Sequence, residues 1–192
     1  MAIHLIDPHV APAARPWVTG GLVLGAIVSA GWILLVAGEI LSDPGGWLGA
    51  AWTAAWLVPS IGLAVIAIAW PRVAYPILVV TTGIVIAAAF GAMFRADALW
   101  QFEDTHGPAS LLVEIGLLIP LTALGRAMPL RAGWLLVLAI AAPLALQAIR
   151  LLIVGQWSVI LVLVIVAAPY ALVALLYIVG ARAQVTSATG DG

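Results

Sequence analysis

Residues 47–70 have the sequence WLGAAWTAAWLVPSIGLAVIAIAW, which contains no charged side chain and has a tryptophan at each end. The hydrocarbon core of a bilayer is about 30 Å thick, and about 20 apolar residues in an α-helix cross it. Indole rings concentrate at the headgroup level, because the ring is largely apolar while its N–H needs a polar partner. The stretch therefore predicts a membrane-spanning helix with one end at each interface.

Five further apolar stretches repeat this pattern. They cover residues 17–41, 75–94, 108–124, 132–149 and 157–179. The chain of 192 residues is 65% hydrophobic and 8% charged, with a mean hydropathy of +1.23, whereas a soluble domain is about 25% charged. We predict an all-α integral membrane bundle of six transmembrane helices joined by short loops. The short stretch 108–124 leaves one alternative open, in which it is a re-entrant segment and the chain has five spans.

The placement of the basic residues predicts the orientation, because arginines in short loops stay on the cytoplasmic side. All seven basic residues are arginine. A cytoplasmic amino terminus leaves only Arg95 and Arg150 outside, and places five inside: Arg15, Arg72, Arg126, Arg131 and Arg182. We predict that both termini are cytoplasmic and that the chain lies in the inner or plasma membrane of the cell. Residues 1–16 then form a cytoplasmic segment, and the small, polar residues 180–192 form a disordered cytoplasmic tail.

The residue inventory excludes several kinds of chemistry. Cysteine is absent, which excludes disulfides and thiolate catalysis, and the three histidines lie outside the spans, which excludes a bis-histidine haem. No span contains an aspartate, there is no glycine-rich phosphate loop with its lysine, and a net charge of −1 offers nucleic acid no basic surface. Asp104 and His106 have side chains that suit a divalent cation, but their spacing matches no metal-site pattern. We expect no cofactor, no metal and no nucleic-acid partner. A non-enzymatic protein is favoured, and a membrane enzyme acting through Glu114 and His106 is the alternative that the residues leave open.

Glu114 is the most informative polar residue, because it lies six residues inside the stretch 108–124, which is roughly 9 Å along a helix. An ionised carboxylate at that depth needs a partner or takes up a proton. Arg150, with Gln147 one turn earlier, reaches a similar depth from the same side, so we predict a contact between Glu114 and Arg150. That contact is either a structural clasp or part of a site for an ionic ligand entering from outside. The candidate polar site comprises Glu39, Arg95, Glu114, Gln147 and Arg150.

Small residues recur every four positions in the first span, at Gly21, Gly25 and Ser29. Such stripes let helices approach closely in a membrane, where lipid supplies no hydrophobic drive for association. The stripe is predicted to be a helix-packing face. Its partner is either another span of the same chain or a second protein.

Three tryptophans lie within spans rather than at their ends. Trp52 and Trp56 are four residues apart on one helix face, and Trp32 lies midway along the first span. They are interpreted either as filling between helices or as the lining of a pocket for a flat or lipidic ligand.

Two functions from different classes are consistent with this sequence. The first is a non-catalytic accessory or scaffold subunit of a membrane assembly, favoured by the small loops and uniformly apolar spans. The alternative is a small-solute binding or transport protein with an outward-facing site around Glu114 and Arg150. The expected partners are the lipid bilayer and either other membrane subunits or further copies of the chain. An exposed helix face rich in glycine and alanine would favour the first function, and a buried cavity reaching Glu114 would favour the second.

Overall fold

The computed structural model describes residues 12–40, 42, 46–94, 109–154 and 158–190, and these form six α-helices without a strand. The helices are α1 (Arg15–Ile40), α2 (Gly46–Ala69), α3 (Pro71–Met93), α5 (Ala109–Leu124), α6 (Pro129–Val154) and α7 (Ser158–Gly190). The prediction of an all-α fold is confirmed, and each predicted apolar stretch corresponds to one helix.

Four helical segments are long and apolar enough to cross a membrane: Arg15–Ile40, Gly46–Ala69, Pro71–Gly91 and Val164–Thr186. Two further apolar segments, Ile115–Leu124 and Pro129–Ala142, are shorter within the described residues. The four long segments indicate that the chain resides in a membrane.

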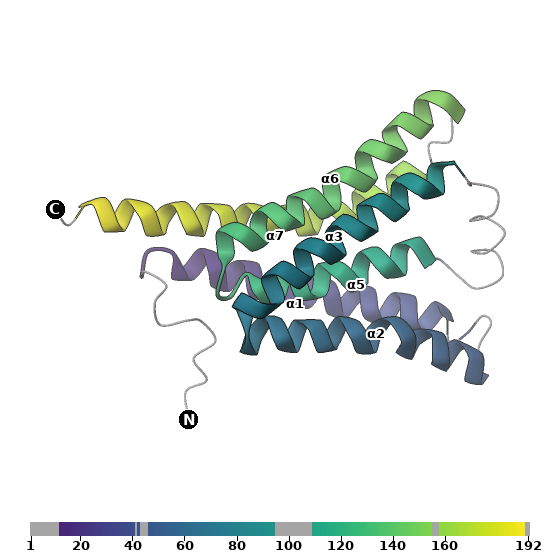
Figure 1. Ribbon diagram of the computed structural model, residues 1–192, viewed down its shortest axis with the longest axis horizontal. Helices are drawn as coiled ribbons and strands as arrows, with labels where there is room; N and C mark the ends of the chain where they lie inside the picture. The colour runs from purple at the N-terminus through teal and green to yellow at the C-terminus, as the bar shows by residue number, and fades with distance from the viewer. Residues whose placement is uncertain (1–11, 41, 43–45, 95–108, 155–157, 191–192) are drawn as a thin grey trace.

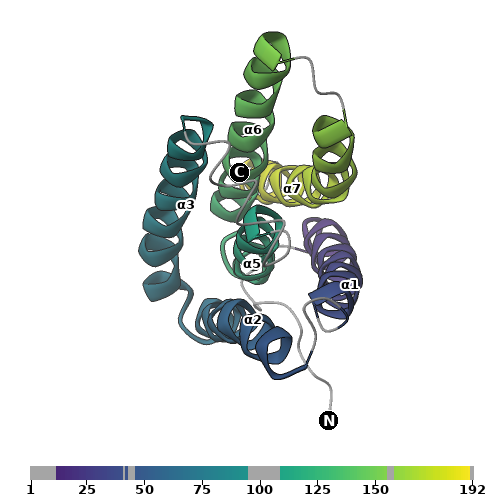
Figure 2. The ribbon, with the colours of Figure 1, turned by 90° about the vertical axis from the view of Figure 1, so that its right-hand side faces the viewer.

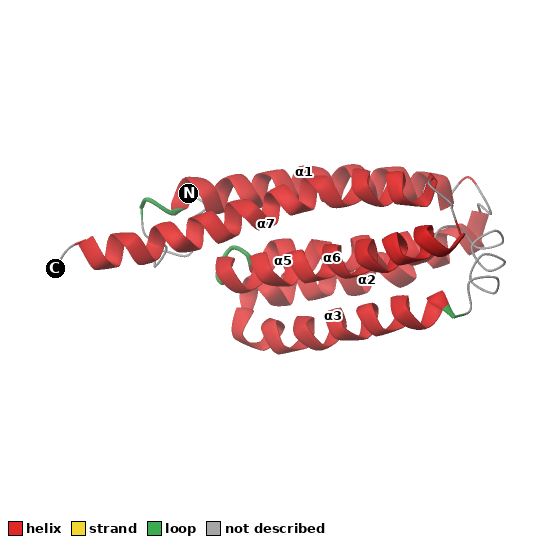
Figure 3. Cartoon of the chain, turned by 90° about the horizontal axis from the view of Figure 1, so that it is seen from above, coloured by secondary structure: helices red, strands yellow, loops and turns green. Residues whose placement is uncertain are grey.

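Successive helices run in opposite directions along the long axis of the molecule (Figures 1 and 3). The starts of α1, α3 and α6 therefore lie at the same end of the bundle as the ends of α2, α5 and α7. Viewed along this axis, α5 lies in the middle (Figure 2) and packs against α1, α2, α3 and α6. We call the shared end the arginine end, because it carries five arginines: Arg15, Arg72, Arg126, Arg131 and Arg182.

Two tight turns close the arginine end. Trp70 alone separates α2 from α3, and its N–H donates to the carbonyl of Ile66 over 2.7 Å. Residues 125–128 join α5 to α6, and their N–H groups donate to the last turn of α5 over 3.0 to 3.3 Å. Pro71 and Pro129 are the first residues of the following helices. At that position a backbone N–H has no acceptor within the helix, so proline, which lacks the N–H, costs no hydrogen bond. The short turns hold α2, α3, α5 and α6 close together.

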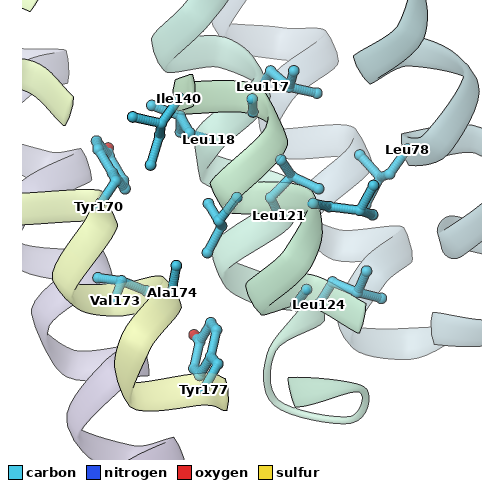
Figure 4. Close-up of a cluster of buried hydrophobic side chains, with 14 of the residues drawn as sticks. Leu78, Leu117, Leu118, Leu121, Leu124, Ile140, Tyr170, Val173, Ala174 and Tyr177 are labelled. Atoms are coloured by element: carbon cyan, nitrogen blue, oxygen red, sulfur yellow. The ribbon is translucent and has the colours of Figure 1, made fainter. Parts of the chain in front are cut away.

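The core of the bundle is built around α5. Four leucines of this helix are at most 4% exposed: Leu117, Leu118, Leu121 and Leu124. They form one cluster with Leu78 of α3, Ile140 of α6 and Tyr177 of α7 (Figure 4). In a membrane the stability of such a cluster comes from close packing, because the surrounding lipid is as apolar as leucine. The helix that the others enclose is thus α5, which is also the shortest of the six.

The end of α7 differs from the prediction. A disordered tail was expected from residue 180, but α7 continues as a helix to Gly190. A Cβ atom at Gly180 would lie 3.2 Å from Cβ of Trp17, so this part of α7 packs against the start of α1. The hydroxyl of Thr186 donates to the carbonyl of Arg182. The packing of Gly180 against α1 accounts for the start of this extension, and no proline follows to break the helix.

Candidate functional site

The predicted packing face of α1 contacts other helices of the same chain. Gly21, Gly25 and Ser29 are all buried. A Cβ atom at Gly25 would overlap the side chain of Thr122 on α5. The hydroxyl of Ser29 lies 2.9 Å from that of Tyr170 on α7, in a buried hydrogen bond. In this structure the face joins α1 to α5 and α7.

Tyr177 of α7 occupies the space that two glycines leave open. A Cβ atom at Gly21, or at Gly125 after α5, would overlap the tyrosine ring. The phenol hydroxyl donates to the backbone carbonyl of Thr122 over 2.7 Å. That carbonyl lies in the last turn of α5 and also accepts the N–H of Gly125 over 3.1 Å. The contact therefore joins α1, α5 and α7 and satisfies a buried phenol.

A second cluster lies between α1, α2, α5 and α7, and we call it the tryptophan cluster. Its fully buried members are Val36 and Ile40 of α1, Ile115 of α5 and Val166 of α7. Its partly buried members are Trp32, Trp52, Trp56 and Ile119. The structure thus brings together the three tryptophans that the sequence singled out.

Thr53 of α2 departs from a rule that the other hydroxyl side chains follow. In the described part of the chain, every other serine or threonine with a described side chain has a hydrogen-bond partner. Most donate to the carbonyl four residues earlier, as Ser60 does to Trp56 over 2.7 Å, which satisfies a hydroxyl where water is absent. The hydroxyl oxygen of Thr53 is buried and has no partner. An unsatisfied buried hydroxyl costs about 1–3 kcal/mol.

The indole N–H of Trp56 is a second buried group without a partner in the described structure. Thr53 and Trp56 are three residues apart, so both lie on one face of α2. Across from them α5 approaches closely, because a Cβ atom at Gly116 would lie 3.9 Å from the Trp56 ring. Two hydrogen-bonding groups thus lie unused beside aromatic rings, which is an arrangement that suits a flat apolar molecule carrying a hydrogen-bond acceptor. Sequence analysis found the tryptophans but missed Thr53.

The candidate polar site is described only in part. Glu39 is exposed on α1 and precedes the buried Ile40 of the tryptophan cluster. The backbone of Glu114 lies on α5 and precedes Ile115 of the same cluster. The side chains of four predicted residues lie outside the described part of the structure: Glu114, Gln147, Arg150 and Arg95. The contact between Glu114 and Arg150 therefore stays a prediction.

The two weak metal-site candidates, Asp104 and His106, also lie outside the described residues. Among the described residues, no group of three or more histidine, aspartate or glutamate side chains is placed to hold a metal ion.

Replacing Thr53 by valine is expected to stabilise the chain when no ligand is bound. Valine keeps the shape of the side chain and removes the unsatisfied hydroxyl, which is worth about 1 kcal/mol or a rise of about 2–4 °C in Tm. The matched control is Thr82→Val on α3, which removes a buried hydroxyl that already donates to the Leu78 carbonyl over 2.7 Å. The control is expected not to raise the Tm of the purified protein. Equal Tm changes in both variants would show that the hydroxyl of Thr53 costs no more stability than the hydrogen-bonded hydroxyl of Thr82.

Comparison with known proteins adds no relative: no family model, no curated protein and no solved structure matches this chain.

Proposed function

We propose that the chain is a six-span integral membrane protein with both termini in the cytoplasm. The alternating directions of the six helices support this, because α1 begins and α7 ends at the arginine end. The arginines at that end belong on the cytoplasmic side. On this proposal α5 also crosses the membrane, enclosed by the other helices.

Within that membrane location, we propose that the protein is a non-catalytic accessory or scaffold subunit of a larger assembly. The observation that carries this proposal is a stripe of small residues on the exposed side of α3, at Gly83, Ala87 and Gly91. A Cβ atom at either glycine would meet no other atom within 4 Å. The opposite side of α3 is occupied, because Ala74 and Leu78 are fully buried in the core. We call Gly83, Ala87 and Gly91 the α3 stripe.

The packing of α1 supports this function for the α3 stripe. On α1, glycines four residues apart are covered by α5 and α7. The α3 stripe has the same spacing, and none of the other described helices lies within 4 Å of a Cβ at either of its glycines. Beside it, Phe90 is 53% exposed and Phe94 is 77% exposed, and their rings contact each other edge to face at 5.4 Å. Small residues next to exposed aromatic rings suit a transmembrane helix of another subunit.

Bulky residues on the α3 stripe are expected to release that subunit. The test compares Gly83→Leu/Gly91→Leu with Gly62→Leu on α2, where a Cβ atom would also meet nothing within 4 Å. After native-level expression and isolation in mild detergent, the double variant should retain at least about tenfold less of the co-purifying protein, which corresponds to about 1.4 kcal/mol of binding energy. The Gly62 variant should retain it fully. Isolation of the unmodified chain as a lone monomer would contradict the subunit function.

The second candidate function is binding or transport of a small solute. It is favoured by the unpartnered groups of Thr53 and Trp56, beside the helix that carries Glu114. Here the polar site around Glu114 and Arg150 would admit the solute from outside, and the tryptophan cluster would hold its apolar part.

Solvent extraction followed by mass spectrometry tests this second function. A bound molecule should appear with the unmodified chain and fall by about fivefold to 150-fold in Thr53→Val/Trp56→Phe, since two lost hydrogen bonds cost about 1–3 kcal/mol together. The control is Thr82→Val/Trp134→Phe, which changes the same residue types away from the cluster. Equal amounts of the molecule in both double variants would argue against the site.

A further inference from the structure

The arginine end carries a concentrated positive charge. Of the described side chains there, five are arginine and none is acidic. The one acidic side chain that the structure describes, Glu39, lies at the opposite end of α1. By sequence, Asp7 and Asp191 belong to the two terminal segments, outside the described residues. At this end Arg72 and Arg131 are both exposed, so they can reach an anionic partner outside the chain.

Three of these arginines come from the two tight turns and the helices next to them. The guanidinium carbon of Arg131 lies 4.8 Å from the centre of the Tyr75 ring. Arg72 lies three residues before Tyr75 and so on the same face of α3. Arg126 lies on the turn between α5 and α6, five residues before Arg131. The ring of Tyr75 thus brings Arg131 of α6 against the face of α3 that carries Arg72.

Like charges placed together repel each other, and the repulsion grows near apolar surroundings. Arg72 and Arg131 are exposed, so their charged groups are open to a partner from outside the chain. Because a guanidinium is planar and presents several N–H groups, it binds phosphate through two hydrogen bonds at once. A phosphate bound by Arg72 and Arg131 would neutralise their charge and use these donors.

The depth of the site identifies the source of the phosphate. Trp70 forms the turn two residues before Arg72, and Trp134 follows Arg131 by three residues; both rings are largely exposed. Exposed tryptophans at helix ends lie at the headgroup level of a bilayer. The arginines between them therefore lie at the depth of phospholipid phosphates, where basic pockets between transmembrane helices bind anionic lipids.

We propose that Arg72 and Arg131 bind the phosphate of an anionic phospholipid in the cytoplasmic leaflet. The site is formed by the α2–α3 and α5–α6 turns, and the tyrosine ring of Tyr75 holds Arg131 in place. This inference rests on the six-span topology proposed above.

The test measures lipid retention by native mass spectrometry after the chain is purified in detergent with phosphatidylglycerol or phosphatidylcholine. The unmodified chain should retain phosphatidylglycerol in preference to phosphatidylcholine. Arg72→Gln/Arg131→Gln should lower that retention roughly tenfold to thirtyfold. The matched control, Arg15→Gln/Arg182→Gln, removes two charges from the same end of the bundle and should change retention by less than about threefold. Arg72→Lys/Arg131→Lys should fall between these results, because lysine keeps the charge and loses the paired hydrogen bonds.

Three results would overturn the proposal: equal loss in both glutamine variants, equal retention of the two lipids, or binding of inorganic phosphate with no preference for phosphatidylglycerol. The first would indicate general charge attraction, and the third a soluble anion. Unchanged Tm values in the arginine variants exclude unfolding as the cause of lost lipid. Failure of the membrane topology would show separately, as recovery of the chain without detergent.

Discussion

Replacing Tyr177 by alanine is expected to lower the Tm of the detergent-solubilised chain by about 6–12 °C. Removal of a buried aromatic side chain costs about 3–5 kcal/mol, and the lower value applies because the apolar surroundings of a membrane protein reduce the transfer part of that cost. For a chain of this size each kcal/mol corresponds to about 2–4 °C. The effect is large because the ring fills the space between Gly21 and Gly125 and bonds to the end of α5.

The control for this prediction is Tyr177→Phe, which keeps the ring and removes only the hydrogen bond to the Thr122 carbonyl. That carbonyl still accepts the N–H of Gly125 over 3.1 Å, so the expected cost is about 1 kcal/mol. The alanine variant should therefore lose about three times as much stability as the phenylalanine variant. Similar Tm values for the two variants would show that the hydrogen bond, and not the ring packing, joins α1, α5 and α7.

The helices themselves could be predicted from the sequence, because about 20 apolar residues in a row have one stable form in lipid. Residues 47–70 illustrate this, since α2 covers Gly46–Ala69. The continuation of α7 to Gly190 could not be predicted in this way. Its first residue, Gly180, contacts Trp17, which is distant in sequence, and hydropathy carries no information about such contacts.

The sequence also does not show which of the small residues lie between helices. The stripe at Gly21 and Gly25 and the stripe at Gly83 and Gly91 have the same spacing. The first is covered by Tyr177 and Thr122, while in the described part of the chain no atom lies within 4 Å of a Cβ on the second. A four-residue spacing of small residues predicts that another helix can approach that side of the helix closely. Only the arrangement of the other helices shows what lies against it.

The unpartnered group of Thr53 was missed for a related reason. A threonine in an apolar helix normally satisfies its own hydroxyl through the preceding turn, so the residue type gives no warning of an exception. The tryptophans beside it could be recognised from the sequence, because they lie within the helices and not at the helix ends, where the aromatic residues of membrane proteins concentrate. The polar residues at the outer end, Glu114 above all, remain predictions from the sequence.

Replacing Gly125 by alanine is expected to destabilise the chain by about 1–3 kcal/mol, through overpacking against the Tyr177 ring. The ring cannot move away, because Gly21 lies against its other side. In the Tyr177→Ala background the same substitution should cost little, since the ring is gone, and the difference between the two backgrounds measures the contact directly.

Gly62→Ala provides the matched control for the change from glycine to alanine. Gly62 lies on α2 with no atom within 4 Å of a Cβ placed there, so alanine should raise stability by up to about 1 kcal/mol through its better helix propensity. Denaturation of each purified variant gives the required differences. A cost at Gly125 that is the same with and without the Tyr177 ring would place the strain in the α5–α6 turn. The glycine–tyrosine contact would then no longer explain how α1, α5 and α7 are held together.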